Sequence, residues 1–130
     1  MNAKCFVKTL CASALILTSS LTLSAENGHN LFYNTEEING LKVAETIYKA
    51  DDGLLANYMK YNYTYDTQKR LTMSEVLVWD SNSNDWQKDV CMRYAYQNGN
   101  ITTTYYQWNK SKGEYVLQPE LTVTMAESDK

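Results

Sequence analysis

A spaced pattern of bulky, mostly aromatic residues occurs three times along the chain. In each copy a first residue is followed by a second after seven positions, a third after eight more and a fourth after two more. The copies are Tyr48, Leu55, Tyr63 and Tyr65; Trp79, Trp86, Tyr94 and Tyr96; and Trp108, Tyr115, Val123 and Met125. They are offset by 31 and then by 29 residues. Self-similarity at this period is typical of an array of supersecondary units.

Strand-like runs separated by short polar breaks predict that these units are β-hairpins. The expected strands are residues 40–49, 54–65, 70–79, 85–97, 100–109 and 114–125. Asn98-Gly99 lies between two of them and is a strong signal for a type I′ turn, which requires positive φ at both central residues. All connections are short, so sequence neighbours should pair antiparallel. The sequence therefore predicts an all-β antiparallel meander of about six strands, built from three hairpin repeats of about 30 residues.

Alternation of apolar and polar residues predicts one buried and one solvent-facing side of the sheet. The residues expected on one side are Leu55, Met59, Tyr61, Tyr63 and Tyr65; Trp86, Val90, Met92, Tyr94 and Tyr96; and Tyr115, Leu117, Leu121, Val123 and Met125. Pro119 lacks an N–H and places the last strand at the sheet edge. Because no amphipathic helix is evident, three arrangements stay open: a sheet curled into a barrel or sandwich, two stacked chains, or a partly open aromatic side.

The first 25 residues are typical of a secretory signal peptide. Lys4 and Lys8 form a basic start, residues 9–23 carry no charge, and Ala25 is a small residue at the expected cleavage position. The apolar run is too short for a transmembrane helix. We therefore expect a signal peptide over 1–25, an N-terminal segment over 26–39 and a β-hairpin repeat domain over 40–130, exported to the periplasm or the outside without a membrane span.

Charge and cysteine content restrict the binding partners and the disulfide bonds that residues 26–130 can have. That region holds ten basic and fifteen acidic residues, a formal charge of −5, without a basic cluster. Such a surface does not favour nucleic acid. Cys91 is the one cysteine left after residue 25, so it has no internal disulfide partner and is expected to be a small apolar strand residue.

One hairpin carries a resemblance to a known family. The segment Tyr63-Thr-Tyr-Asp-Thr-Gln-Lys-Arg-Leu-Thr72 resembles the Tyr-x-Tyr-Asp-x-x-Gly-Arg-Leu-Thr hairpin of small exported proteins of gut Bacteroidetes, a domain-of-unknown-function family. These hairpins are also similar to the tyrosine–aspartate repeats of large secreted toxins. Residues 94–102 form a shortened second copy, and Lys69 stands where the family has Gly. The resemblance implies a fold and no activity.

Catalytic and metal-binding signals are sparse. His29 is the single histidine and falls on the N-terminal segment, which disfavours a Ser/His/Asp or Cys/His arrangement. Residues 80–85 match the start of a calcium loop, but Asp85 stands at the glycine position and Cys91 at the position of the final glutamate. We expect no enzyme, cofactor or metal. A small secreted hydrolase is the least favoured alternative, and Asp80, Asp85 and Glu75 would be its acids.

Aromatic residues are the main candidates for a binding function. The chain has 11 Tyr and 3 Trp, whose rings pack against the C–H faces of sugars or against protein surfaces. The same rings are also explained by cross-strand packing within a sheet. The candidate ligand contacts are Tyr58, Trp79, Trp86, Tyr105, Tyr106 and Trp108. The leading hypothesis is a glycan- or protein-surface-binding module of the cell envelope, and the alternative is a structural protein whose aromatic face is consumed in a homo-oligomer.

Overall fold

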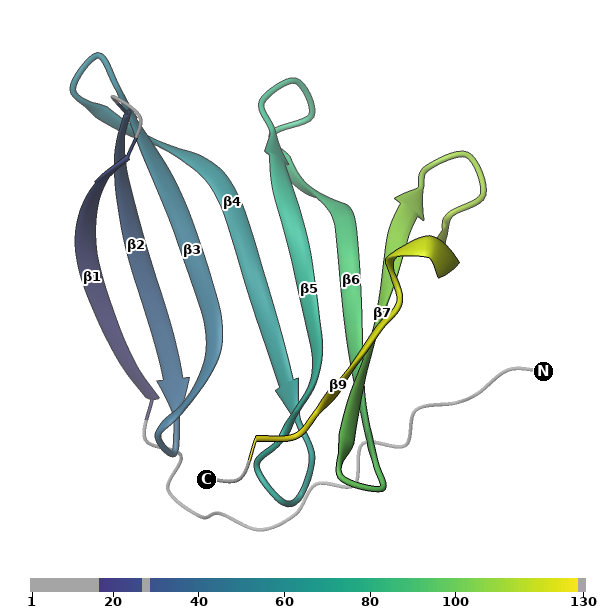
Figure 1. The fold of residues 1–130 in the computed structure, drawn as a ribbon. Coiled ribbons are helices and arrows are strands. Elements are labelled where there is room, and N and C mark those ends of the chain that lie inside the picture. The colour runs from purple at the N-terminus through teal and green to yellow at the C-terminus, as the bar shows by residue number, and fades with distance from the viewer. Residues whose placement is uncertain (1–16, 27–28, 129–130) are drawn as a thin grey trace, which may run out of the picture.

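The computed structural model describes residues 17–26 and 29–128. They form one open antiparallel sheet with a single short 3-10 turn (Figure 1). The strands are β1 Leu17–Glu26, β2 His29–Ile38, β3 Leu41–Asp51, β4 Leu54–Tyr65, β5 Leu71–Asp80, β6 Asp85–Gln97, β7 Asn100–Asn109, β8 Glu114–Leu117 and β9 Val123–Ala126, with η1 at Pro119–Leu121. In these residues no helix is long and apolar enough to cross a membrane. The all-β antiparallel meander is confirmed.

Strand order in the sheet follows the chain from β1 to β8, and β9 returns to pair with β7. The expected count of six strands was wrong. Two strands, β1 and β2, precede residue 40, and the strand expected over 114–125 is divided by η1. Pro119 causes that division because its fixed φ and missing N–H suit a turn and not a ladder. With these additions the sheet does not divide into three hairpins, although its last strands do lie at the edge, as Pro119 predicts.

Three of the hairpins turn through two residues with positive φ. Asn98 and Gly99 have φ of 53° and 72°, which confirms the turn expected there. Asp52-Gly53 and Asn39-Gly40 adopt the same signs. Positive φ at both positions gives a turn whose twist matches that of the strands it joins, and this fixes the register of each pair.

The register contains β-bulges that the sequence pattern did not reveal. Ile47 pairs with Met59 but Tyr48 pairs with Asn57, so Tyr58 is the extra residue of β4. Val76 pairs with Val90 but Leu77 pairs with Lys88, so Asp89 is the extra residue of β6. A bulge adds one residue to one strand and reverses the relation between sequence parity and sheet face beyond it.

Because of these bulges, the expected grouping of side chains on one face was wrong. Met59 pairs with Ile47 whereas Leu55 pairs with Ala50, and residues 47 and 50 point to opposite sides of β3. By the same argument Trp86 lies opposite to Val90, and Tyr115 lies opposite to Val123. In every copy of the pattern, the first two residues therefore lie on one face and the last two lie on the other.

We call the two sides by their aromatic residues. The tryptophan face carries Trp79, Trp86, Trp108, Tyr106 and Tyr115. The tyrosine face carries Tyr61, Tyr63, Tyr65, Tyr94, Tyr96 and Tyr105. Side chains directly opposite one another in an antiparallel pair share a face, which extends each assignment across the sheet.

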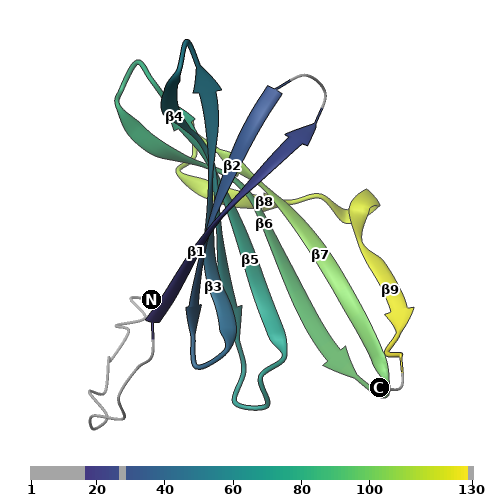
Figure 2. The same cartoon turned by 90° about the vertical axis from the view of Figure 1, so that its left-hand side faces the viewer.

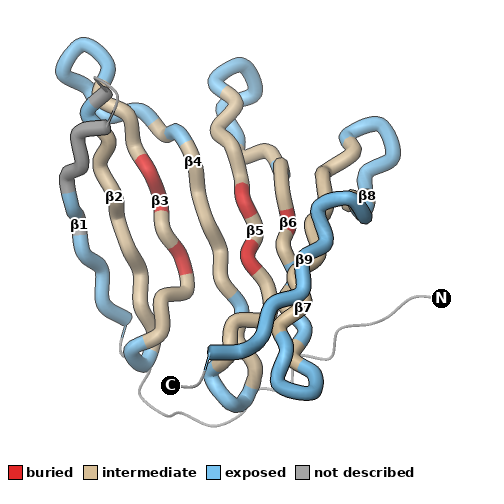
Figure 3. The backbone as a smooth tube through the Cα atoms, viewed as in Figure 1, coloured by how far each residue is buried: buried red, intermediate tan, exposed pale blue. Residues whose placement is uncertain are grey.

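The described residues form a single layer with little buried interior. Every strand belongs to the same sheet, which Figure 2 shows as a twisted layer. Buried side chains are confined to β3, β5 and β6 (Figure 3). They are Ala44, Thr46, Ile47, Ser74, Val76 and Cys91, and none of the large side chains is fully buried. Both aromatic faces are therefore half-buried by their own neighbours and open to a partner. Of the three arrangements that the sequence left open, the structure of the single chain shows the third, an open sheet.

Candidate functional site

The tryptophan face ends in two cross-strand aromatic pairs near the turns that follow β5 and β7. Trp79 lies opposite Trp86 with ring centroids 5.1 Å apart and planes inclined by 70°. Trp108 lies opposite Tyr115 with centroids 5.0 Å apart and planes inclined by 69°. Edge-to-face pairs of this kind are favoured because the positive ring edge meets the negative ring face. The four rings are half-buried.

Lys88 lies over the second aromatic pair. Its ammonium lies 4.8 Å from the centroid of Trp108 and 5.6 Å from that of Tyr115. Lys88 sits beyond the Asp89 bulge, which turns its side chain onto the tryptophan face. A cation over an aromatic ring is attracted by the ring quadrupole. The bulge thus puts a positive charge over the rings of Trp108 and Tyr115.

A carboxylate adds a polar group beside the same rings. The Tyr115 hydroxyl donates a hydrogen bond of 2.7 Å to Glu75 Oε1. Burial, followed by this bond to a negative acceptor, raises the pKa of Tyr115, so its phenol stays protonated at neutral pH. Trp79, Trp86, Trp108 and Tyr115, together with Lys88 and Glu75, are defined here as the aromatic surface. It combines flat apolar rings with one cation and one anion.

The tryptophan face continues from the aromatic surface toward the opposite ends of the strands. The Arg93 guanidinium lies 5.2 Å from the ring centroid of Tyr106, which is itself one of the candidate ligand contacts. Cys91 pairs with Tyr106 in the ladder and is buried. Burial raises the pKa of the Cys91 thiol, which keeps it protonated and unreactive. Cys91 is therefore a small buried strand residue that packs within the sheet, as the sequence predicts.

The six candidate contacts do not form one site. Trp79, Trp86, Trp108 and Tyr106 lie on the tryptophan face, whereas Tyr105 lies on the tyrosine face opposite Met92. Tyr58 occupies a bulge in β4 and is 42% exposed. Sequence reasoning did not name Tyr115 or Lys88 as contacts, and it named Glu75 only as a candidate hydrolase acid. The recurrence of Tyr115 at the position of Trp86 was the available signal for Tyr115; no signal in the sequence pointed to Lys88.

The acidic residues named for a hydrolase have turn or packing roles. Asp80 accepts hydrogen bonds from the Asn82 N–H at 3.0 Å and the Ser83 hydroxyl at 2.9 Å, and these bonds lower its pKa. Asp85 accepts the Trp86 N–H at 2.8 Å. Glu75 accepts from Tyr115. Within residues 17–26 and 29–128, no three His, Cys, Asp or Glu side chains are grouped to hold a metal ion.

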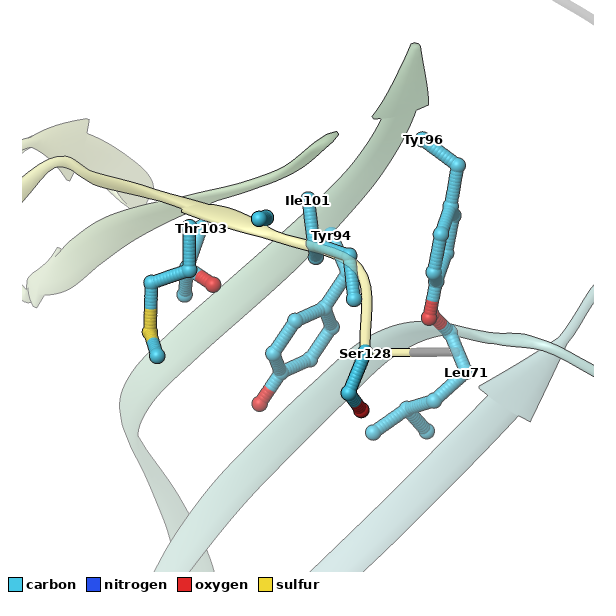
Figure 4. A pocket seen from close by; sticks show the side chains of 8 residues that line it. Leu71, Tyr94, Tyr96, Ile101, Thr103 and Ser128 are labelled. Carbon is cyan, nitrogen blue, oxygen red and sulfur yellow. The ribbon is translucent and has the colours of Figure 1, made fainter. Parts of the chain in front are cut away.

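The tyrosine face has a shallow hollow beside β9 (Figure 4). It encloses about 380 Å³ and is lined by Leu71, Tyr94, Tyr96, Ile101, Thr103, Met125, Ala126 and Ser128. The Tyr96 hydroxyl donates to the Leu71 carbonyl at 2.7 Å, and the Tyr94 and Ser74 hydroxyls are 3.3 Å apart. These polar atoms are engaged within the sheet, so the hollow offers mainly apolar contact to a ligand.

The hairpin between β4 and β5 is held by its acidic residue. Asp66 Oδ1 accepts the N–H groups of Gln68 and Arg70, each at 2.9 Å, and Oδ2 accepts Arg70 Nε at 2.8 Å. The Arg70 guanidinium also lies 4.5 Å from the ring centroid of Tyr96. The Tyr-Asp…Arg-Leu-Thr segment thus has a structural role.

The chain matches a known protein family over nearly its whole length. A model for a family of unknown function, DUF3836, matches residues 1–126. The chain belongs to this family. The expected membership of a domain-of-unknown-function family is confirmed. No protein with a curated function matches this chain.

Crystal structures of similar proteins support the fold. A DUF3836 protein from Bacteroides vulgatus is 52% identical with a TM-score of 0.70, and the match covers 73% of this chain and 97% of the other. A second, from Parabacteroides distasonis, is 24% identical with a TM-score of 0.66, over 77% and 93% of the two chains. A protein of unknown function from Bacteroides fragilis is 28% identical with a TM-score of 0.65, over 70% and 68%.

Proposed function

We propose that this DUF3836 protein is an exported, non-catalytic glycan-binding module and that the aromatic surface is its binding site. The observation that carries the proposal is the arrangement of Trp79, Trp86, Trp108 and Tyr115 as two adjacent ring pairs on an uncovered sheet face. An aromatic patch without a covering layer is typical of a surface that meets a partner.

The chemistry of the aromatic surface suits a sugar. Ring faces provide apolar area for the C–H faces of a pyranose, and the Lys88 ammonium and Glu75 carboxylate lie close enough to bond its hydroxyls. Lys88 is solvent-exposed, so its ammonium can leave the ring of Trp108 to donate to a ligand oxygen. Export would bring this surface to the polysaccharides of the envelope or the surroundings.

Self-association through the same rings is the second candidate. It is favoured by the absence of a covering layer over residues 29–128, because a second copy would remove the rings from water. Light scattering of Trp108→Ala distinguishes the two, because only association through the rings depends on Trp108. A Trp108→Ala protein with the same mass as the unaltered protein excludes consumption of the rings by a second copy.

Tryptophan fluorescence during titration with soluble polysaccharides tests the proposal. All three tryptophans of the chain belong to the aromatic surface, so a ligand there must alter their emission. We expect a saturable shift, and an affinity about five- to thirtyfold weaker in Trp108→Ala, since a well-packed ring contributes about 1–2 kcal/mol to a binding interface. Tyr58→Ala removes an exposed aromatic ring away from the aromatic surface and is the control.

Two results would contradict this function. One is the absence of saturable binding to every polysaccharide and envelope fraction in the panel. The other is an equal loss of affinity in Tyr58→Ala and Trp108→Ala, because the site would then not be the aromatic surface.

A further inference from the structure

The two edges of the sheet differ in how they resist pairing with another strand. At one edge, β7 is covered by β8 and β9, which have four residues each and are separated by Pro119 in η1. Short strands and proline are devices that prevent edge-to-edge association. This edge is closed to a further strand.

The opposite edge is closed only by β1. Its ladder with β2 runs without interruption from Leu17 opposite Ile38 to Glu26 opposite His29. β2 itself has ten residues and contains no proline, glycine, lysine or arginine. Its acidic residues, Glu36 and Glu37, and the bulge opposite them in β3 are confined to one end. The stretch from residue 29 to residue 35 lacks the features that blunt an edge strand, and β1 shows that the free side of β2 accepts a full antiparallel partner.

β1 belongs to the part of the chain that export would remove. Cleavage after Ala25 leaves only Glu26 of this strand. The backbone N–H and C=O groups on the outer side of β2 then lose their partners along its length. Those groups make a ready template for a new strand.

We infer that the processed protein forms a dimer in which β2 of one copy pairs antiparallel with β2 of a second copy, in the place that β1 holds before cleavage. The inference rests on the export part of the proposed function and uses a surface separate from the aromatic one. Because both copies present the same strand, the contact is closed by a two-fold axis.

The charge distribution of β2 favours this partner and this direction. Glu36 and Glu37 stand near its end, and Asn30 and Leu31 stand near its start. An axis through Asn34 places Glu37 opposite Leu31 of the second copy, whereas parallel pairing would place the acidic residues side by side. Like charges directly opposite one another destabilise a ladder. The blunted edge at β8 and β9 limits the assembly to two copies.

The test begins with the chain exported and processed by a bacterial host, whose intact mass identifies its N-terminus. Light scattering should give the mass of two chains. In Asn34→Lys, the two lysines lie directly opposite one another at the axis, and we expect the dissociation constant of the dimer to rise about fivefold. Thr124→Lys, on the blunted edge, is the matched control and should leave the dimer unchanged.

A second variant covers the case in which Asn34→Lys fails to fold. Asn34→Cys should be joined to its equivalent in the second copy by a short bis-maleimide, and Thr124→Cys should not. The unaltered chain, whose Cys91 is buried, serves as the blank.

Three results overturn the inference. A processed monomer does so directly, and a dimer unaffected by either β2 variant places the contact elsewhere. A chain that keeps residues 1–25 overturns export and β2 pairing together. Loss of glycan binding with an intact β2 dimer overturns only the binding function.

Discussion

At the level of single residues, the backbone conformation of Lys69 is unfavourable for its residue type. The non-glycine residues with positive φ in the described chain are Asn39, Asp52, Lys69, Asn84 and Asn98. Asn and Asp tolerate this region because their short side chains can hydrogen-bond locally. Lys69 has φ of 62° and no such compensation, and it stands at the position where the hairpin motif has Gly. Its backbone is strained, and the hydrogen bonds of Asp66 hold it there.

We predict that Lys69→Gly stabilises the protein. Glycine adopts positive φ without a Cβ penalty, and the gain should be about 0.5–1 kcal/mol after the greater entropy of glycine in the unfolded chain is subtracted. Urea unfolding followed by circular dichroism measures it. Lys69→Ala keeps the Cβ and should show no gain. An equal gain in both variants would mean that the lysine side chain, not the backbone, carries the cost.

At the level of elements, the bulges decide which aromatic rings meet. The extra residues Tyr58 and Asp89 occupy corresponding places in β4 and β6, each one step beyond the pairs Ile47–Met59 and Val76–Val90. Beyond the second bulge Trp86 faces Trp79 on the tryptophan face. Without it, Trp86 would join Val90 and Tyr94 on the tyrosine face. One inserted residue thus separates the bulky residues of the first two copies of the pattern between two faces.

The Trp79–Trp86 pair should show a measurable coupling in stability. A double-mutant cycle with Trp79→Ala, Trp86→Ala and their combination is expected to give about 0.5–1.5 kcal/mol, the range found for edge-to-face aromatic pairs. Chemical denaturation supplies the four free energies of unfolding. Trp86→Ala combined with Tyr65→Ala, on the opposite face, is the control and should be additive. Additivity in the Trp79–Trp86 cycle would show that the pair has no specific contact energy.

At the scale of the whole molecule, a single layer must be stabilised by its ladders and by packing between neighbours on each face. Hydrogen bonds from side chains reinforce the ladders over long sequence separations. The Tyr65 hydroxyl donates to the Lys42 carbonyl at 2.7 Å, and Tyr96 does the same to Leu71. Burial raises the pKa of Tyr63 to about 12, which keeps this half-buried phenol neutral in the physiological range. The tyrosine face therefore adds side-chain hydrogen bonds and packing that stabilise the layer.

Hydrogen exchange should reveal where this layer is held. Amides of β5 and β6, which have a strand on both sides and include the buried Val76 and Cys91, are expected to exchange slowest. Amides of β9, whose residues are all exposed, should exchange fastest among the strands. Mass spectrometry of peptides measures both. Protection of β9 equal to that of β5 would show that the C-terminal edge is covered in solution.

The sequence by itself determined the strands from residue 40 to residue 109, the turns at Asn98-Gly99 and its equivalents, the antiparallel order, the family and the edge position of Pro119. Period-two alternation and turn chemistry are local properties, so short windows of sequence carry them. Tertiary structure alone decided the bulges, and with them which face each aromatic ring occupies. It also brought Glu75 to Tyr115, 40 residues apart. A bulge depends on how two strands register against each other, and alternation within one strand holds no record of that.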